Sequence, residues 1–148
     1  VTKKIVQGLV RVKKGLQNKL TLGNIYAIRD WGHAKDYATS MWKILQYKKP
    51  DDWVIATNKD QTVKKFIEIV SKKLDISLKW VGKGINEKGI DKDNGRVIID
   101  LDKKYLRPSE VDFLRGDFSK ARKLLRWSPK ISTDNLIDDM IDEELSIY

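Results

Sequence analysis

Helix-spaced apolar residues alternate in this chain with short, continuous apolar runs, and this alternation is what most constrains its fold. Ile5, Leu9, Val12 and Leu16 recur at the three- and four-residue spacing of an amphipathic helix. Helices interleaved with strands predict an α/β fold. We expect helices over residues 2–15, about 33–47, 61 or 62 to 74, 119–125 and from 133 onward, and strands over residues 19–22, 53–57, 77–81 and 97–101.

Several local features carry their own expectations. In the helix near residues 33–47 we expect one apolar face to be buried, and we expect His33 to be a structural residue at its start. Asp117 is a candidate cap for the helix over 119–125. The polar segment 29–31 predicts a loop, and the glycine-rich segment 82–95 predicts an exposed loop. The expected buried face of the 33–47 helix comprises Ala34, Tyr37, Ala38, Met41, Ile44 and Leu45.

The length and composition of the chain exclude several classes of protein. Its 148 residues and 41% hydrophobic content fit one globular domain with a core of its own. There is no cysteine and only one histidine, which excludes thiolate chemistry and a histidine-rich metal site. No apolar run has the roughly 20 residues needed to cross a bilayer. We therefore expect a soluble cytoplasmic protein, and the start at Val1 without an initiator Met suggests a fragment.

The charge of the chain is unevenly distributed. The net charge is +9, but residues 131–148 hold six acidic and no basic residues, so residues 1–130 carry thirty basic and fifteen acidic side chains. Such a field attracts anions, whether DNA, an anionic membrane surface or a nucleotide phosphate. The lysine pairs are spread along the chain rather than concentrated, which is also what solvated helix faces produce.

Residues 97–117 are the most informative stretch for function. The apolar run 97–101 leads to Arg107, Pro108 and Glu110, so that a guanidinium and a carboxylate stand on a proline-stiffened turn. A guanidinium can donate two hydrogen bonds to a phosphate, and a carboxylate can accept from the hydroxyls of a sugar. The pattern suits a sugar nucleotide, and an ordinary loop with a surface ion pair explains it equally well.

Other catalytic and binding motifs are absent from the sequence. Gly82, Gly84 and Gly89 miss the dinucleotide-binding spacing, and Ile90 follows where a phosphate loop needs lysine. No tyrosine has a lysine four residues later, so the Tyr and Lys pair of short-chain dehydrogenases is missing. His33 would be the only base for a catalytic triad. The chain therefore reads as a binding module, with no catalytic residue and no metal site.

Motifs along nearly the whole chain resemble the C-terminal, sugar-nucleotide-binding part of the GDP-mannose 4,6-dehydratases, which are extended short-chain dehydrogenases. The RDWGHAKDY and YLRPSEVD segments are the most specific of these motifs. The resemblance rests on residues 1–5 (VTKKI), 22–24 (LGN), 29–37 (RDWGHAKDY), 54–57 (VIAT), 87–89 (EKG), 105–112 (YLRPSEVD), 116–117 (GD) and 127–129 (WSP).

The resemblance implies an α/β lobe over residues 1–148 that closes over GDP-mannose, without the N-terminal Rossmann half that holds NADP and the catalytic residues. It places cations near the pyrophosphate, Glu110 near a ribose hydroxyl and the backbone of residues 22–24 beside guanine. It also implies a homo-oligomeric parent enzyme with no nucleic-acid or membrane partner. The substrate-binding residues carried over are Val1, Lys4, Leu22, Gly23, Asn24, Arg29, Arg107 and Glu110.

By resemblance, the parent enzyme converts GDP-mannose to GDP-4-keto-6-deoxymannose with NADP, and this part alone is inactive. Three positions depart from the family pattern: Lys3 replaces an arginine, Tyr26 an acidic residue and Asn58 a glycine. Two alternatives remain open. One is a lobe of another sugar-nucleotide dehydratase or epimerase, and the other is a non-enzymatic basic module that binds nucleic acid.

Overall fold

The computed structural model describes residues 1–107 and 109–148, which form two compact units. Unit 1 comprises residues 1–27, 62–112 and 137–148, and unit 2 comprises residues 28–61 and 113–136. Pro108, which the sequence predicts to stiffen the turn after Arg107, lies outside the described residues. Each unit is therefore assembled from segments that are distant in the sequence.

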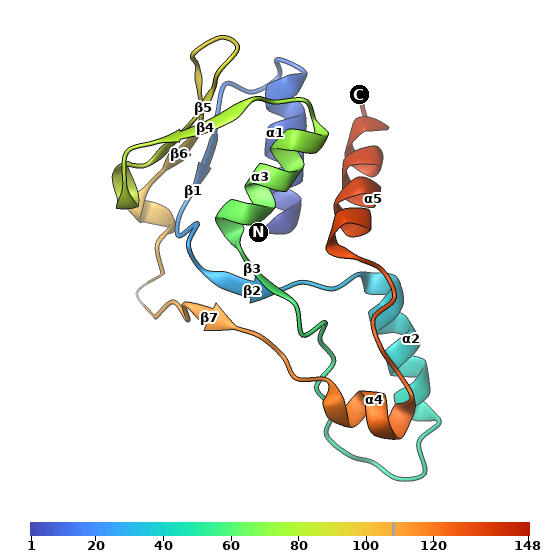
Figure 1. The fold of residues 1–148 in the computed structure, drawn as a ribbon. Helices are drawn as coiled ribbons and strands as arrows, with labels where there is room; N and C mark the ends of the chain where they lie inside the picture. Colours follow the sequence, from blue (N-terminus) through green and yellow to red (C-terminus); the bar gives the residue numbers. More distant parts are fainter. Residues whose placement is uncertain (108) are drawn as a thin grey trace. The chain divides into compact units, whose positions relative to one another are not determined.

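Unit 1 is built on a four-stranded sheet that two helices cover on one face (Figure 1). β1 and β6 are parallel, and the other neighbouring strands are antiparallel. The strand order is β1 (Leu20–Leu22), β6 (Val97–Leu101), β5 (Lys88–Asp91) and β4 (Leu78–Val81), and the covering helices are α1 (Thr2–Lys13) and α3 (Val63–Lys73).

The core of unit 1 lies between these two helices and the sheet. Ile5 and Leu9 of α1, Phe66 and Val70 of α3 and Ile99 of β6 are fully buried. Ile5 and Leu9 of the predicted α1 stripe therefore face inward, whereas Leu16 lies beyond the helix and is 60% exposed, so its placement in the stripe is wrong. From Ile137 on, helix α5 (Thr133–Leu145) also belongs to unit 1, and it buries Ile137 and Ile141.

Unit 2 combines two helices with a small sheet. The strand order is β3 (Asp60–Thr62), β2 (Ile28–Asp30) and β7 (Phe113–Leu114), and β2 and β7 are parallel. The helices are α2 (Ala34–Leu45) and α4 (Ser119–Leu125). Their core cluster is formed by Ala121, Leu125 and Trp127, against which Tyr37, Ile44, Tyr47, Trp53, Ile55 and Phe118 pack.

The predicted helix starts are confirmed by their caps. The hydroxyl of Thr62 accepts a hydrogen bond from the Lys65 amide at 3.0 Å and caps α3. His33 caps α2, because its ring nitrogen accepts from the Lys35 amide at 3.0 Å. Both bonds satisfy amides that a helix leaves without internal partners. Asp117 accepts from the Ser119 amide at 2.8 Å, although the residue at the cap position of α4 is Phe118.

Two predicted loops contain strands. Segment 82–95 includes the 3-10 helix η1 (Gly84–Asn86) and strand β5, and the polar segment 29–31 includes part of β2. The sequence conceals β5 because Gly89 contributes no apolar side chain. A Cβ at Gly89 would lie 2.9 Å from Leu78 and 3.0 Å from Ile99, so the neighbouring strands fill the space instead.

The strand predicted over residues 53–57 is wrong, because this segment belongs to neither sheet. Trp53 and Ile55 are partly buried against the core cluster of unit 2. Val54 between them is 53% exposed. The apolar run therefore has the composition of a buried strand without a strand partner among the described residues.

The predicted inner face of α2 is also largely wrong. Met41 is 64% exposed and Leu45 is 80% exposed, and Ala34 and Ala38 are exposed as well. The buried residues of α2 are Asp36 and Ser40.

This reversal has a polar cause. The Asp36 carboxylate accepts hydrogen bonds from the Lys130 and Ile131 amides at 2.9 and 2.8 Å, and the Asp36 carbonyl accepts from the indole of Trp127 at 3.0 Å. Lys43 donates to the Arg126 carbonyl at 2.8 Å. Backbone groups of this segment that lack helix or sheet partners bond instead to Asp36 and Lys43 on the polar face of α2.

No helix in the described part of the chain is long and apolar enough to cross a membrane.

We expect Thr62→Ala to lower the free energy of unfolding by about 1 kcal/mol, because it removes the side-chain cap of α3. Urea denaturation followed by circular dichroism measures this loss. Thr39→Ala is the matched control, because Thr39 is an exposed residue within α2 whose hydroxyl bonds only the Lys35 carbonyl of its own helix. Equal stabilities of the two variants would contradict a capping role for Thr62.

Candidate functional site

The loop after β1 is locked against the segment after β6. The Leu22 carbonyl accepts a hydrogen bond from the Asp102 amide at 2.9 Å. Gly23 follows, and a Cβ at this position would overlap the carbonyl oxygen of Tyr105, which belongs to the 3-10 helix η2 (Lys103–Tyr105). Only glycine allows so close an approach of two backbones. The predicted site residues Leu22 and Gly23 therefore adjoin the segment that leads to Arg107.

The first turn of α1 adjoins the same segment. The Lys4 ammonium lies 4.1 Å from the centre of the Tyr105 ring, which is cation–π distance. Val1 precedes the helix, is exposed, and accepts a hydrogen bond from the Ile5 amide at 3.1 Å through its carbonyl. Lys4 is thus held over an aromatic ring, while Val1 serves the backbone of the first turn.

Asn24 joins this loop to the end of the 102–112 segment. Its amide group donates to the Asp112 carboxylate at 3.5 Å, and its side-chain oxygen accepts from the Tyr26 amide at 2.9 Å. The Glu110 amide donates to the Arg107 carbonyl at 3.2 Å, so these two residues stand at the ends of one tight turn. This bond brings Arg107 and Glu110 close together, and the chain reaches Arg107 through η2 rather than directly from the strand.

Arg29 is the one predicted site residue in unit 2. It is the central residue of β2, and its guanidinium donates to the Ile28 carbonyl at 2.8 Å. Together with Tyr37, Val54, Leu114 and others it lines a cavity of about 330 Å³. Burial, followed by the nearby Asp30 carboxylate, raises the pKa of the Tyr37 hydroxyl. An aromatic hydroxyl that stays protonated next to a guanidinium offers donors to an anionic ligand.

Asp30, which lines the same cavity, holds the chain at residues 57 and 58. Its carboxylate accepts hydrogen bonds from the Thr57 amide at 3.0 Å and from the Asn58 amide at 2.9 Å. Asn58 has a backbone φ of 57°, a left-handed conformation that favours glycine and that asparagine tolerates better than most residues. This conformation explains why asparagine can replace the glycine of the family pattern at this position.

Sequence reasoning missed a buried ionic network behind the Asn24 loop. Glu87 is only 5% exposed, and its carboxylate accepts from the Lys64 ammonium at 2.7 Å and from the Tyr26 hydroxyl. Burial alone raises the pKa of the Glu87 carboxyl, but the bonds from Lys64 and Tyr26 outweigh burial and hold that pKa below its ordinary value. The same bond to Glu87 raises the pKa of Tyr26. Tyr26 thus fills the acidic position of the family pattern as a donor to Glu87.

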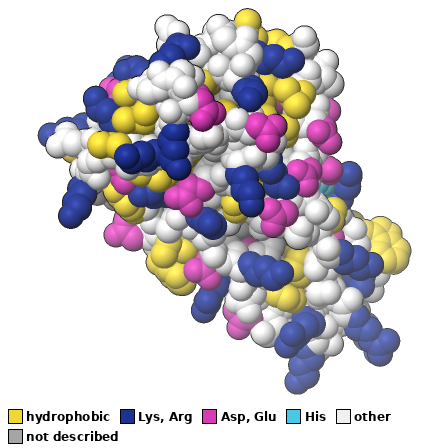
Figure 2. Space-filling view, turned by 45° about the horizontal axis from the view of Figure 1, so that its top comes forward, with side chains coloured by type: hydrophobic (Ala, Val, Ile, Leu, Met, Phe, Trp, Pro, Cys, Tyr) yellow, Lys and Arg dark blue, Asp and Glu magenta, His cyan; other side chains and the backbone are white. Residues whose placement is uncertain are grey.

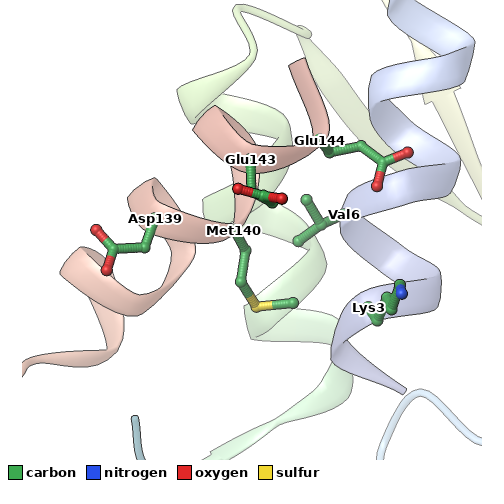
Figure 3. A pocket seen from close by; sticks show the side chains of 6 residues that line it. All are labelled: Lys3, Val6, Asp139, Met140, Glu143 and Glu144. Atoms are coloured by element: carbon green, nitrogen blue, oxygen red, sulfur yellow. The ribbon is translucent and has the colours of Figure 1, made fainter. Parts of the chain in front are cut away.

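A separate cavity of about 320 Å³ lies between α1 and α5 (Figure 3). Its charged lining consists of Lys3 and three carboxylates, and Val6 and Met140 complete it. One ammonium against three carboxylates disfavours a pyrophosphate. None of the predicted substrate-binding residues lines this cavity, and Lys3 alone contributes to it from the motif at residues 1–5. The three carboxylates are those of Asp139, Glu143 and Glu144.

On the face that Figure 2 shows, charges of both signs are interspersed. Figure 2 shows Lys and Arg side chains over much of one face of the molecule, with Asp and Glu side chains between them. The described residues hold no group of three or more His, Asp or Glu side chains that could bind a metal ion. Neither observation indicates a nucleic-acid groove or a metal centre.

Comparison with known proteins identifies the family. The family model described as GDP-mannose 4,6 dehydratase matches residues 1–140. The chain belongs to the GDP-mannose 4,6 dehydratase family. It is 46% identical to GDP-mannose 4,6 dehydratase 1 of Arabidopsis thaliana and 41% identical to the human GDP-mannose 4,6 dehydratase. These alignments cover 99% of the chain but only 36% and 40% of the two relatives. A family member of this length thus spans about two fifths of the relatives it matches.

Solved structures confirm the α/β fold. RMD from Pseudomonas aeruginosa, complexed with NADPH, aligns with this family member at a TM-score of 0.77 and 17% identity. The alignment covers 99% of this chain and 43% of RMD. UDP-glucose 4-epimerase from Thermotoga maritima, solved with UDP-glucose, matches 95% of the chain with a TM-score of 0.68 and 15% identity, over 38% of its length.

We expect Glu87→Gln to lower the free energy of unfolding at neutral pH by about 1–3 kcal/mol, because a buried charged partner is lost. The folded pKa of Glu87 lies below its ordinary value, so its contribution is complete above the ordinary carboxyl range and is lost as the pH falls through the folded pKa. The difference between the variant and the wild type should therefore shrink in acid. Urea denaturation between pH 3 and 7 measures it.

Glu143→Gln is the control for this pH series, because Glu143 is exposed on α5. Its curve should run parallel to that of the wild type at every pH. A Glu87→Gln variant with the same acid dependence as the wild type would show that the Lys64–Glu87–Tyr26 network does not stabilise unit 1.

Proposed function

We propose that this chain is the substrate-binding part of a GDP-mannose 4,6-dehydratase, the enzyme that converts GDP-mannose to GDP-4-keto-6-deoxymannose. The observation that carries the proposal is the packing of the predicted ligand residues of unit 1 around one segment. Lys4 and Gly23 contact Tyr105, and Asn24 contacts Asp112. All three residues therefore lie near the segment that carries Arg107 and Glu110.

The proposed roles follow from the charge and hydrogen-bonding capacity of each side chain. Lys4 and Arg107 of unit 1 supply cations to the pyrophosphate, since an anion removed from water requires charged partners. Glu110 accepts from ribose hydroxyls. The backbone of residues 22–24 adjoins guanine. Val1 completes the substrate-binding set at the start of α1.

The residues of this chain do not fit a dinucleotide cofactor. A dinucleotide fold places its glycine-rich turn between a strand and the N-terminus of an α-helix. Here Gly82 and Gly84 lead from β4 into η1 and then into β5. We therefore propose that NADP is held by the part of the enzyme that this chain does not match.

The catalytic residues of the dehydratase are proposed to lie in that same part, an N-terminal Rossmann half. The chain alone is then a binding lobe without dehydratase activity, and its partners are GDP-mannose and the Rossmann half. The parent enzyme is proposed to be a cytoplasmic homo-oligomer. The lobe contributes affinity and orientation, because a firm grip on the GDP group fixes the position of the hexose.

We expect the chain to bind GDP-mannose saturably in calorimetric titrations and to bind UDP-glucose and a short DNA duplex much more weakly. Arg107→Ala should weaken GDP-mannose binding about ten- to a hundredfold, the effect of losing a hydrogen bond to a charged group. Arg96→Ala is the control, because it removes the same charged group from another exposed position of unit 1. Its affinity should equal that of the wild type.

Other outcomes would assign a different function. A preference for UDP-glucose would indicate another sugar-nucleotide enzyme. DNA binding that falls steeply with salt and survives Arg107→Ala would indicate a basic nucleic-acid-binding module. Equal losses in the Arg107 and Arg96 variants would show that general charge, rather than a phosphate contact, governs binding.

A further inference from the structure

Tyr26 lies two residues after the proposed ligand loop 22–24, and its hydroxyl is bonded inside unit 1. It donates to one oxygen of the Glu87 carboxylate, which is buried. The Tyr26 side chain itself is 47% exposed, so packing holds it on one side only. A hydrogen bond to a carboxylate has a fixed direction, and this bond therefore restrains the ring and the backbone that carries it.

The Lys64 ammonium holds the second oxygen of the same carboxylate. It lies 2.7 Å from that oxygen of Glu87, 4.8 Å from the centre of the Trp80 ring and 5.8 Å from the centre of the Tyr26 ring. A carboxylate and two aromatic rings each attract an ammonium group at these distances. Lys64 therefore has three partners in one place, and they fix the position at which Glu87 accepts from Tyr26.

The backbone around Tyr26 is also attached to α3. The carbonyls of Ile25 and Ala27 accept hydrogen bonds from the first two amides of this helix, at 2.7 and 3.0 Å. Tyr26 between them is held through its hydroxyl, and its amide donates to the side-chain oxygen of Asn24 at 2.9 Å. The anchored residue therefore orients the side chain of Asn24.

Asn24 connects Tyr26 to the other side of the proposed site. Its amide group donates to the Asp112 carboxylate at 3.5 Å, at the end of the segment that carries Arg107 and Glu110. The oxygen and the amide group of a carboxamide point in different directions, so a bond that holds the oxygen also directs the donor. The amide of Tyr26 thus helps to aim Asn24 at Asp112.

We propose that Tyr26 is a positioning residue for the sugar-nucleotide site: its hydroxyl, held by Glu87, fixes the Asn24 side chain and with it the guanine side of the site relative to the phosphate side. The inference rests on the proposed function and adds a residue that acts through Asn24 rather than by touching the ligand. The family pattern has an acidic residue at this position, so a phenol in this role is a property of this chain.

The first test is a calorimetric titration of the wild-type chain and of Tyr26→Phe with GDP-mannose. The variant keeps the ring beside Lys64 and removes only the hydroxyl. We expect about tenfold weaker binding, the effect of losing one hydrogen bond to a charged group. Tyr148→Phe is the matched control, because it also removes a hydroxyl that bonds charged side chains of unit 1, Arg11 at 2.8 Å and Glu144 at 3.4 Å. Its affinity should equal that of the wild type.

A double-mutant cycle separates positioning from a general loss of stability. It compares Tyr26→Phe, Asn24→Ala and the double variant, and Asn24→Ala leaves the backbone of the ligand loop in place. If Tyr26 acts through Asn24, the double variant should bind no more weakly than Asn24→Ala alone, because nothing further is lost. Losses of affinity that multiply in the double variant would show two independent effects and overturn the proposal.

Hydrogen exchange without ligand gives a measurement that does not depend on binding. The amides of residues 22–27 should exchange about fivefold faster in Tyr26→Phe than in the wild type and in Tyr148→Phe, because the loop opens more often. Equal exchange in all three proteins would overturn the proposal.

The two measurements together separate the inference from the proposed function. A loop that exchanges faster in Tyr26→Phe, in a chain that binds no GDP-mannose, supports the link from Tyr26 to Asn24 and overturns the function. A chain that binds GDP-mannose with the same affinity in Tyr26→Phe as in the wild type overturns the positioning role alone.

Discussion

Parallel pairing between distant strands is the constraint on which both units depend. β1 pairs with β6 in unit 1, and β2 pairs with β7 in unit 2. Parallel strands leave their sheet in the same direction, so the segments that follow them meet at one edge. The register Leu22 to Leu101 therefore brings Gly23 and Asn24 next to the segment that carries Arg107 and Glu110. A one-residue shift would turn these side chains to the other face of the sheet.

The predicted substrate-binding residues of unit 1 gather at this edge, and a buried charge supports the loop that carries them. The Glu87 carboxylate is buried and is held by the half-buried Lys64 ammonium, because a carboxylate is costly to bury without a charged partner. Tyr26 joins them through its hydroxyl, and its backbone amide bonds to the side chain of Asn24. The network thus extends from the first turn of α3 to the loop beside Gly23. The departure from the family pattern at position 26 keeps this link, because a phenol can donate to a carboxylate where an acidic residue would repel it.

Much of the fold could be predicted from the sequence where local chemistry decides the structure. The caps His33 and Thr62 and the apolar run of β6 act through neighbouring residues and were predicted correctly. β5 and β2 could not be found, because their strand character comes from partners and not from their own polar and glycine-containing sequences. The gathering of Lys4, Gly23 and Asn24 near Arg107 followed only from the family resemblance, since residue spacing does not reveal strand register. Nothing in the sequence around Glu87, apart from its place in a family motif, indicated that its carboxylate would be buried and paired with Lys64.

Helix α2 shows why amphipathic spacing alone cannot orient a helix. Burying Met41, Trp42 and Leu45 within unit 2 would contribute about 1.5–3 kcal/mol each. That rotation would remove Asp36 and Lys43 from the backbone of residues 125–131, and the buried Asp36 carboxylate, left without the Lys130 and Ile131 amides, would cost a comparable amount. The charge-assisted bonds also have fixed directions, whereas apolar burial has none. Polar groups of unit 2 therefore set the rotation of α2 about its axis. The apolar stripe faces outward because the polar contacts of α2 face inward.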